Sequence, residues 1–272
     1  MLDRSRPKAP AFARWLLIGM FVFLLLPLSM MILSSFIQFS SGSMIEITFR
    51  YWKEVFDDEP LRDSLLNSLM VAFSASTVSV ALGSLAALAL AKTKFFGQSF
   101  LRMSSVLSLV FPEIVFALSL LSLFFVLGIQ LGLWTVVIAH ISFSLPYVIL
   151  TVGARAASLD RSLDDAAADL GASDYILLRR IHLPLLKPAI ISSFFIAFLL
   201  SFDDFLITYF VNGVGYDTLP IKLYTSMKTG ITPKLNALAT MIFLTTSMIL
   251  FLLFRSPSLN KTLEDLNKNE NF

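Results

Sequence analysis

Long apolar runs alternate with short charged segments along the chain. Six runs approach or exceed the roughly 20 apolar residues that a helix needs to cross the hydrocarbon core of a bilayer. They cover residues 15–37, 64–91, 103–127, 132–152, 187–211 and 236–254. None shows the alternation over about ten residues that marks a membrane β-strand. The pattern therefore predicts an all-α membrane protein with six transmembrane helices in one domain, residues 15–255.

The composition agrees with this prediction. Of the 272 residues 56% are hydrophobic, whereas soluble domains are about 45–50% apolar. The chain has no cysteine, which excludes disulfides and thiolate metal sites, and its two histidines are too few for a metal cluster. The first apolar run is longer than the core of a signal peptide, so we interpret it as an uncleaved span.

The positive charges are unequally divided between the two sides of the predicted spans. If the N-terminus is cytoplasmic, fifteen of the 21 Lys and Arg residues lie in cytoplasmic segments and six outside. Such a bias is typical of the cytoplasmic side. We therefore expect residues 1–14 and the tail 256–272 in the cytoplasm, together with the loop 156–186. The chain is expected to contact the lipid bilayer and to bind no nucleic acid.

The loop between the fourth and fifth runs is amphipathic. Apolar residues recur at helical spacing and form one stripe of a short helix: Leu163, Ala166, Ala167 and Leu170. Four aspartates lie off the stripe and are expected to face water or a partner: Asp160, Asp164, Asp165 and Asp169. A helix that merely rests in the membrane interface is the alternative interpretation.

The second half of this loop carries the signals of a helix end and a new helix. Gly171 tolerates positive φ and can end the first helix. Ser173 or Asp174 can cap a second helix, which we expect to end before Pro184 because the residue before a proline disfavours the helical conformation.

The spacing of this loop resembles the EAA loop of ABC-importer permeases. Asp165-Ala166-Ala167 is followed by Gly171 and then by Ile181, Leu183 and Pro184, with Asp in place of the usual Glu. The resemblance implies that these seven residues dock a cytoplasmic ATPase. The chain has no G-x-x-x-x-G-K-[ST] phosphate loop. We therefore expect ATP and Mg to bind the partner ATPase, and no cofactor to bind this chain.

A second resemblance covers most of the chain after the first run. The stretch Ser201-Phe202-Asp203-Asp204-Phe205 is similar to permease subunits of spermidine/putrescine importers, the PotC/PotI branch. This resemblance implies a type I ABC-importer permease fold in a prokaryotic cytoplasmic (inner) membrane. It also implies a heterodimer with a second permease, an ATPase dimer and a periplasmic or extracellular polyamine-binding protein. A related importer that transports another solute is the alternative interpretation.

Charged residues inside predicted spans are the candidates for the solute path. Insertion of one charged side chain at mid-bilayer costs roughly 2.5–3.5 kcal/mol of free energy, so such residues usually have a function. On a continuous helix Asp204 would share a polar face with Ser201, Thr208 and Asn212, whereas Asp203 would point about 100° away. We therefore expect Asp204 to line the path and Asp203 to pair with a neighbouring helix or subunit. Both could instead be structural partners of a cation on the other permease.

Two further residues complete the candidate pathway. Tyr209 could contribute a cation–π contact. Glu113 follows Pro112 near the start of the third run, where we expect a structural or gate residue close to the cytoplasmic interface. His140 is expected to be a buried, hydrogen-bonded histidine and not a proton relay.

Two other classes of protein remain as alternatives. An ion-driven secondary transporter or channel would use Asp203, Asp204 and Glu113 as ion sites. An intramembrane enzyme would need a nucleophile and a base, and no motif supplies them, so we expect a non-catalytic subunit. Finally, small residues form one face of the second run: Ser68, Ala72, Ala75, Ser79 and Gly83. Such faces bring helices close together, within a subunit or against a partner.

Overall fold

The computed structural model describes residues 11–39, 45–228, 230 and 232–255. The predicted tail 256–272 and most of the predicted segment 1–14 lie outside the described residues. The chain divides into two units, which are described separately. The first unit comprises Met1–Glu59 and Thr225–Thr245, and the second comprises Pro60–Tyr224 and Thr246–Phe272.

The first unit contains a long exposed helix and a small hairpin. Helix α1 (Ala11–Ser34) is followed by strands β1 (Ile37–Phe39) and β2 (Ile45–Ile47), which pair antiparallel. Helix α2 (Arg50–Phe56) comes next, and its Trp52 ring stacks on Phe36 at 5.1 Å between ring centroids. An ion pair joins Asp58 to Lys234 in the first turn of α12 (Pro233–Arg255).

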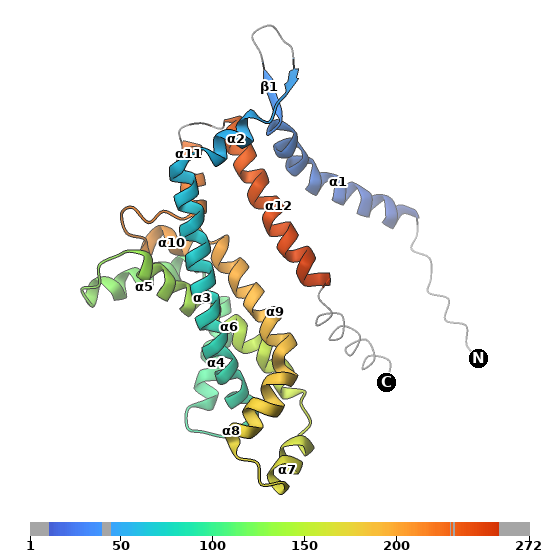
Figure 1. Cartoon of the computed structure of the whole chain (residues 1–272), viewed down its shortest axis with the longest axis vertical. Helices are drawn as coiled ribbons and strands as arrows, with labels where there is room; N and C mark the ends of the chain where they lie inside the picture. Colours follow the sequence, from blue (N-terminus) through green and yellow to red (C-terminus); the bar gives the residue numbers. More distant parts are fainter. Residues whose placement is uncertain (1–10, 40–44, 229, 231, 256–272) are drawn as a thin grey trace. The chain divides into compact units, whose positions relative to one another are not determined.

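The second unit holds the remaining helices, except for the first residue of α3 and the last four residues of α11, which belong to the first unit (Figure 1). In chain order they are α3 (Glu59–Lys92), α4 (Gln98–Val110), α5 (Glu113–Val126), α6 (Leu133–Ala157), α7 (Ser162–Asp169), α8 (Asp174–Leu177), the π-helical turn η1 (Leu178–His182), α9 (Leu183–Phe202), α10 (Leu206–Val211) and α11 (Leu219–Lys228). Helix α6 packs along α9, and α10 packs against α5 and α6. Helices α7 and α8 lie together at one end of the unit.

The small-residue face of α3 is buried inside this unit. Ala72, Ala75 and Ser79 are fully buried, and the Ser79 hydroxyl donates a hydrogen bond to the Ile141 carbonyl of α6. A Cβ atom at Gly83 would come within 2.7 Å of Val148 Cγ1. The small residues therefore let α3 and α6 approach closely, and this face is used within the subunit, which is one of the two expected alternatives.

The prediction of membrane-spanning helices is confirmed in part. Among the described residues, four helices are long and apolar enough to cross a membrane, or five if α4 and α5 count as one broken span. They cover Phe12–Ser34, Glu59–Lys92, Leu133–Ala157 and Asp174–Phe202. The sixth apolar run is occupied by α12.

Three predicted helix boundaries are wrong. The run 103–127 is not one helix, because α4 and α5 meet at 115°. Phe111 is extended there, with ψ 135°, as expected of a residue that precedes proline. The run 187–211 breaks after Phe202.

The third wrong boundary is the expected helix end before Pro184. The chain stays helical from Asp174 through η1 into α9. Pro184 lies in the first turn of α9, where the missing N–H is tolerated.

Candidate functional site

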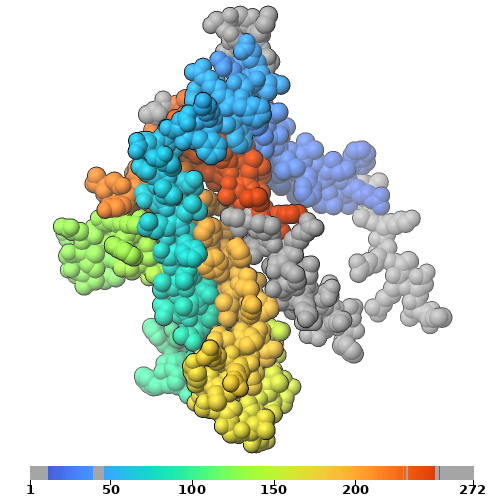
Figure 2. Space-filling view, viewed as in Figure 1, coloured from blue at the N-terminus to red at the C-terminus, as the bar shows by residue number. Residues whose placement is uncertain are grey.

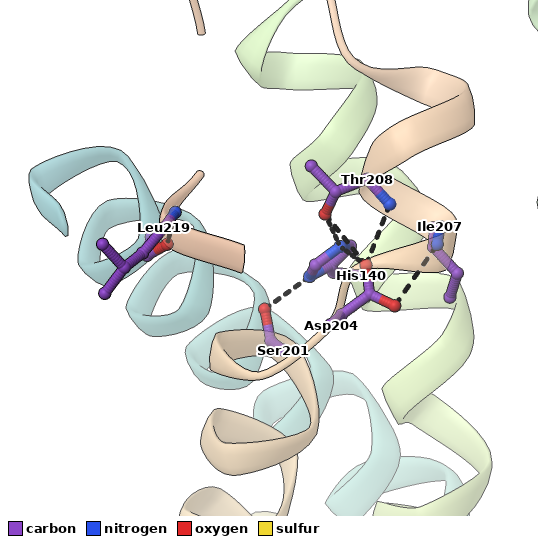
Figure 3. A network of polar contacts seen from close by, with 7 residues as sticks. His140, Ser201, Asp204, Ile207, Thr208 and Leu219 are labelled. Atoms are coloured by element: carbon purple, nitrogen blue, oxygen red, sulfur yellow. Dashed lines mark hydrogen bonds and ion pairs between the residues drawn. The ribbon is translucent and has the colours of Figure 1, made fainter. Parts of the chain in front are cut away.

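The candidate site is built around the break between α9 and α10. Residues Asp203–Phe205 separate the two helices. The carboxylate of Asp204 accepts hydrogen bonds from the backbone N–H groups of Ile207 (3.3 Å) and Thr208 (2.9 Å). It also accepts one from the Thr208 hydroxyl, at 2.9 Å (Figure 3). Asp204 thus satisfies N–H groups that the first turn of α10 would otherwise leave without partners.

His140 of α6 connects the two sides of the break. Its Nδ1 lies 2.6 Å from Ser201 Oγ on α9, and its Nε2 lies 3.0 Å from Thr208 Oγ1 on α10. Nε2 is also 3.1 Å from Asp204 Oδ2. All four side chains are buried. The expectation of a buried, hydrogen-bonded His140 is confirmed, and the cluster ties α6, α9 and α10 together (Figure 3).

The predicted polar stripe on one continuous helix is wrong. Ser201, Asp204 and Thr208 do meet, but they meet through His140 and across a helix break. Asn212 lies beyond the end of α10, where its side-chain amide donates to Asp217 Oδ1 at 3.3 Å. Helical spacing alone could not show that a short helix begins after Asp204.

A cavity of about 640 Å³ lies beside this cluster. Three carboxylates line it, those of Glu113, Asp203 and Asp204, together with aromatic and aliphatic side chains: Phe143, Tyr147, Phe205, Ile196, Leu199, Leu200 and Leu206. Asp203 is exposed, whereas Asp204 is only 7% exposed. Both aspartates thus line the cavity, and Asp203 is the more exposed of the two.

Glu113, which was expected to be a structural or gate residue, lies at the cavity. It is the first residue of α5, directly after the bend at Pro112. There its side chain lines the same cavity as Asp203 and Asp204. Tyr209 is half-exposed and packs its ring against Phe205 and Tyr224, outside the set of cavity-lining residues.

The predicted docking loop has the expected turn. Gly171 has φ +73°, which favours glycine, and it separates α7 from α8. Ser173 is extended and directly precedes α8. Of the predicted contact residues, Asp165, Ala166, Leu183 and Pro184 are exposed, Ile181 is half-buried and Ala167 is buried. Figure 2 shows the yellow segment around α8 at the surface of this unit.

Asp164 was expected, like the other three aspartates of the loop, to face water or a partner, and this expectation is wrong. The apolar stripe is mostly open to solvent, since Leu163 and Leu170 are 40% and 88% exposed. Asp164, in contrast, turns inward. Its Oδ2 lies 2.8 Å from Lys92 Nζ and its Oδ1 lies 2.8 Å from His182 Nε2. No local pattern reveals this contact, because Lys92 is far away in the sequence.

These contacts stabilise the ionised form of Asp164. Partial burial by itself would raise the pKa of the Asp164 carboxyl group. The hydrogen bonds and the positive charges of Lys92 and His182 outweigh burial and lower the pKa below its usual value of 3.8.

Comparison with known proteins identifies the class of protein. Residues 79–261 match the family described as binding-protein-dependent transport system inner membrane component, and the chain belongs to this family. It is therefore a multi-pass inner-membrane permease component.

Its relatives include permeases of named transport systems. The chain is 37% identical over 231 residues to the spermidine/putrescine transport system permease protein PotC of Haemophilus influenzae, covering 84% of this chain and 90% of the relative. It is 36% identical to PotC of Escherichia coli (strain K12), covering 90% and 92% of the two chains. It is also 36% identical to the putrescine transport system permease protein PotI of the same strain, covering 84% and 83%.

Solved structures share the fold. A bacterial ABC transporter involved in the import of the acidic polysaccharide alginate has a chain that aligns with a TM-score of 0.70. The alignment covers 90% of this chain and 95% of that chain at 17% sequence identity. An amino acid ABC transporter aligns with a TM-score of 0.58, covering 76% and 97% at 18% identity. These similarities establish the fold of an ABC-transporter permease.

Proposed function

We propose that this chain is the permease subunit of an ATP-driven importer and forms part of a translocation path for spermidine or putrescine. The observation that carries the proposal is the cavity beside the α9–α10 break. Its carboxylates can replace part of the hydration of an ammonium group, and the rings of Phe143, Tyr147 and Phe205 add surfaces that attract cations. The names of the relatives point to the same class of solute.

The three carboxylates of this cavity have different proposed roles. Asp204 already contacts His140 and accepts hydrogen bonds from the first turn of α10, so its oxygens are occupied within the chain. Asp203, which is exposed, and Glu113, which is half-buried, line the cavity and are placed to meet an incoming cation. A small number of such groups also favours release, since a solute that is bound too tightly would not leave the path.

The loop between α6 and α9 is the proposed docking site for the ATPase. Its exposed residues Asp165 and Ala166, the left-handed turn at Gly171 and the open Leu163 and Leu170 offer a short, structured surface. ATP and Mg would bind the ATPase dimer, and this chain would bind no cofactor and perform no covalent chemistry. A second permease and a polyamine-binding protein outside the membrane complete the proposed importer.

The proposed topology has six transmembrane segments with both termini in the cytoplasm. Helices α4 and α5 together form the third segment, and α12 forms the sixth. The excess of Lys and Arg in the segments that follow α3 and α6 and precede α9 supports a cytoplasmic position of the docking loop.

The test is ATP-dependent uptake into proteoliposomes that contain this chain, its partner permease and the ATPase, with the binding protein supplied outside. Labelled spermidine should enter only when ATP is enclosed with the ATPase. Uptake by this chain alone, driven by an ion gradient without ATP, would instead establish a secondary transporter. ATPase activity that is stimulated by another solute, with no spermidine uptake, would remove the polyamine assignment.

Docking has its own test, namely binding of the purified ATPase to the permease pair. Gly171→Pro should reduce this binding at least tenfold, because proline fixes φ near −65° and cannot adopt the left-handed turn. Glycine residues elsewhere with φ > 0, such as Gly128, provide the control substitution Gly128→Pro. Normal ATPase binding by the Gly171 variant would contradict the docking proposal.

A further inference from the structure

Asp164 joins three segments that are distant in sequence. Lys92 is the last residue of α3, Asp164 lies in the first turn of α7, and His182 ends η1 directly before α9. The Asp164 carboxylate contacts both basic side chains at 2.8 Å, one with each oxygen. Lys92 Nζ also donates to the Leu159 carbonyl, in the segment that leads into α7, at 3.4 Å.

This cluster differs from an ordinary ion pair on a protein surface. The side chains of Lys92 and His182 are only 11% and 7% exposed, and that of Asp164 is 24% exposed. Exposed pairs contribute little because water screens them and their side chains must be ordered. In this cluster water is largely excluded, and both carboxylate oxygens have a partner with a fixed position.

Helix α9 extends from this cluster to the cavity. It begins directly after His182 and ends at Phe202, next to Asp203. Its 20 residues correspond to about 30 Å of helix at the usual rise per residue. Near its far end Ser201 is held by His140. Helix α9 is thus held by polar contacts at both ends, one beside α7 and the other beside the cavity.

We propose that Asp164 is a positioning residue that fixes α7 to the ends of α3 and α9, so that movement of the docking loop displaces α9 instead of bending the loop. The proposal rests on the docking function proposed above. Asp164 does not itself contact the ATPase in this account: it faces Lys92 and His182, whereas its neighbour Asp165 is exposed. Loss of the cluster should leave docking in place and weaken the link from docking to transport.

The first experiment measures the position of α7 without any ATPase. The chain has no cysteine, so a pair of spin labels can be attached at single cysteines that replace the exposed residues Lys94 and Ala168. We expect a narrow distance distribution in the otherwise unchanged chain and a clearly broader one after Asp164→Asn. Lys92→Met should give the same broadening, whereas Asp169→Asn, an exposed aspartate on the same helix, should give none.

An unchanged distribution in both the Asp164 and the Lys92 variants would overturn the proposal. Because no ATPase is present, this result does not depend on whether the loop docks one. The docking proposal is contradicted by a different result, namely normal ATPase binding by the Gly171→Pro variant. The two experiments therefore distinguish failure of the docking proposal from failure of the positioning proposal.

The second experiment uses the complete transporter and compares ATPase binding with transport. In the Asp164→Asn transporter we expect ATPase binding within a few-fold of normal, and about tenfold less solute imported per ATP hydrolysed, which lies within the usual range of coupling between sites. A parallel loss of ATPase binding and uptake would make Asp164 part of the docking surface and overturn the positioning role. Unchanged coupling would overturn it as well.

Discussion

His140 Nε2 lies 3.1 Å from Asp204 Oδ2, and both side chains are only 2% exposed. The same histidine contacts Ser201 and Thr208, one on each side of the break between α9 and α10. A helix break inside a membrane domain frees backbone N–H and C=O groups, and buried groups of this kind need partners. The pair of His140 and Asp204 therefore stabilises the break, and the break in turn places Asp203 beside the cavity.

Replacement of His140 should destabilise the permease. His140→Ala leaves the buried Asp204 carboxylate without one of its partners, which costs about 1–3 kcal/mol. The melting temperature of the purified permease pair in detergent should fall. Ser142→Ala, which removes a half-buried hydroxyl group that bonds within the same helix, is the matched control and should change the melting temperature little. Equal melting temperatures for the His140 variant and the parent would mean that the cluster does not hold the break.

Replacement of Asp203 should impair transport and leave assembly intact. Its exposed carboxylate lines the cavity, and loss of a charge-assisted hydrogen bond of about 1.5–3 kcal/mol corresponds to roughly a 10–100-fold loss in kcat/KM for uptake. Initial rates of spermidine uptake in proteoliposomes measure this change for Asp203→Asn.

Two further variants serve as comparisons for Asp203. Asp63→Asn removes an exposed carboxylate that is not among the cavity-lining residues, and its uptake should equal that of the parent. Asp204→Asn should instead lower the melting temperature, because its carboxylate holds the first turn of α10. An Asp203 variant with normal uptake kinetics would remove this residue from the path.

Packing between α3 and α6 should be sensitive to a single methyl group. In Gly83→Ala the new Cβ would lie 2.7 Å from Val148 Cγ1, and overpacking of this kind typically costs about 1–3 kcal/mol. Gly153→Ala is the control, because its nearest neighbour would lie at 3.9 Å, an ordinary contact distance. Thermal unfolding in detergent should separate the two variants. A Gly83 variant as stable as the Gly153 variant would show that the two helices separate easily.

The Asp164 cluster should persist in mildly acidic solution. The pKa of Asp164 is lowered in the folded chain, so its stabilising effect is complete above the usual carboxyl range and is lost as the pH falls through the lower, folded pKa. Three charged groups influence this result: Lys92, His182 and Asp160, whose own charge interacts with Lys92.

The measurement compares the melting temperatures of two chains at several pH values, one with Asp164 and one with Asp164→Asn. Both carry His182→Gln, which removes the titration of the imidazole from the comparison, and Lys92 remains as the cation that lowers the pKa of Asp164. The difference in melting temperature between the two chains should be constant from pH 7 to pH 5 and should shrink below the usual pKa of 3.8. A difference that disappears between pH 7 and pH 5 would contradict the ion pair.

The sequence predicts the elements whose signals are local. The apolar runs locate α1, α3, α6 and α12 to within a few residues, because apolar length is a property of each segment alone. Two glycines also have local signals. Gly171 adopts the positive φ that favours glycine at a turn. Gly83 lies on a face of small residues that lets another helix approach closely.

Long-range contacts decide the features that the sequence did not predict. Hydropathy cannot distinguish a continuous helix at residues 187–211 from two helices joined at Asp203–Phe205, because both are equally apolar. The capping role of Asp204 depends on His140, which is separated from Ser201 and Thr208 by 61 and 68 positions. The inward position of Asp164 likewise depends on Lys92, 72 positions away. The bend at Pro112 does have a local signal, but nothing local shows that it brings Glu113 to the cavity.

The proposed function requires that Glu113 and Asp203, which line the cavity, form part of a polyamine path. The most direct measurement is ATP-dependent uptake of labelled spermidine by the complete transporter, with the parent chain compared with the double variant Glu113→Gln/Asp203→Asn. We predict uptake by the parent and a loss of at least tenfold in the double variant, as expected when two charge-assisted contacts are removed, with the complex still assembled and the ATPase still bound. Undiminished uptake by the double variant would contradict the account.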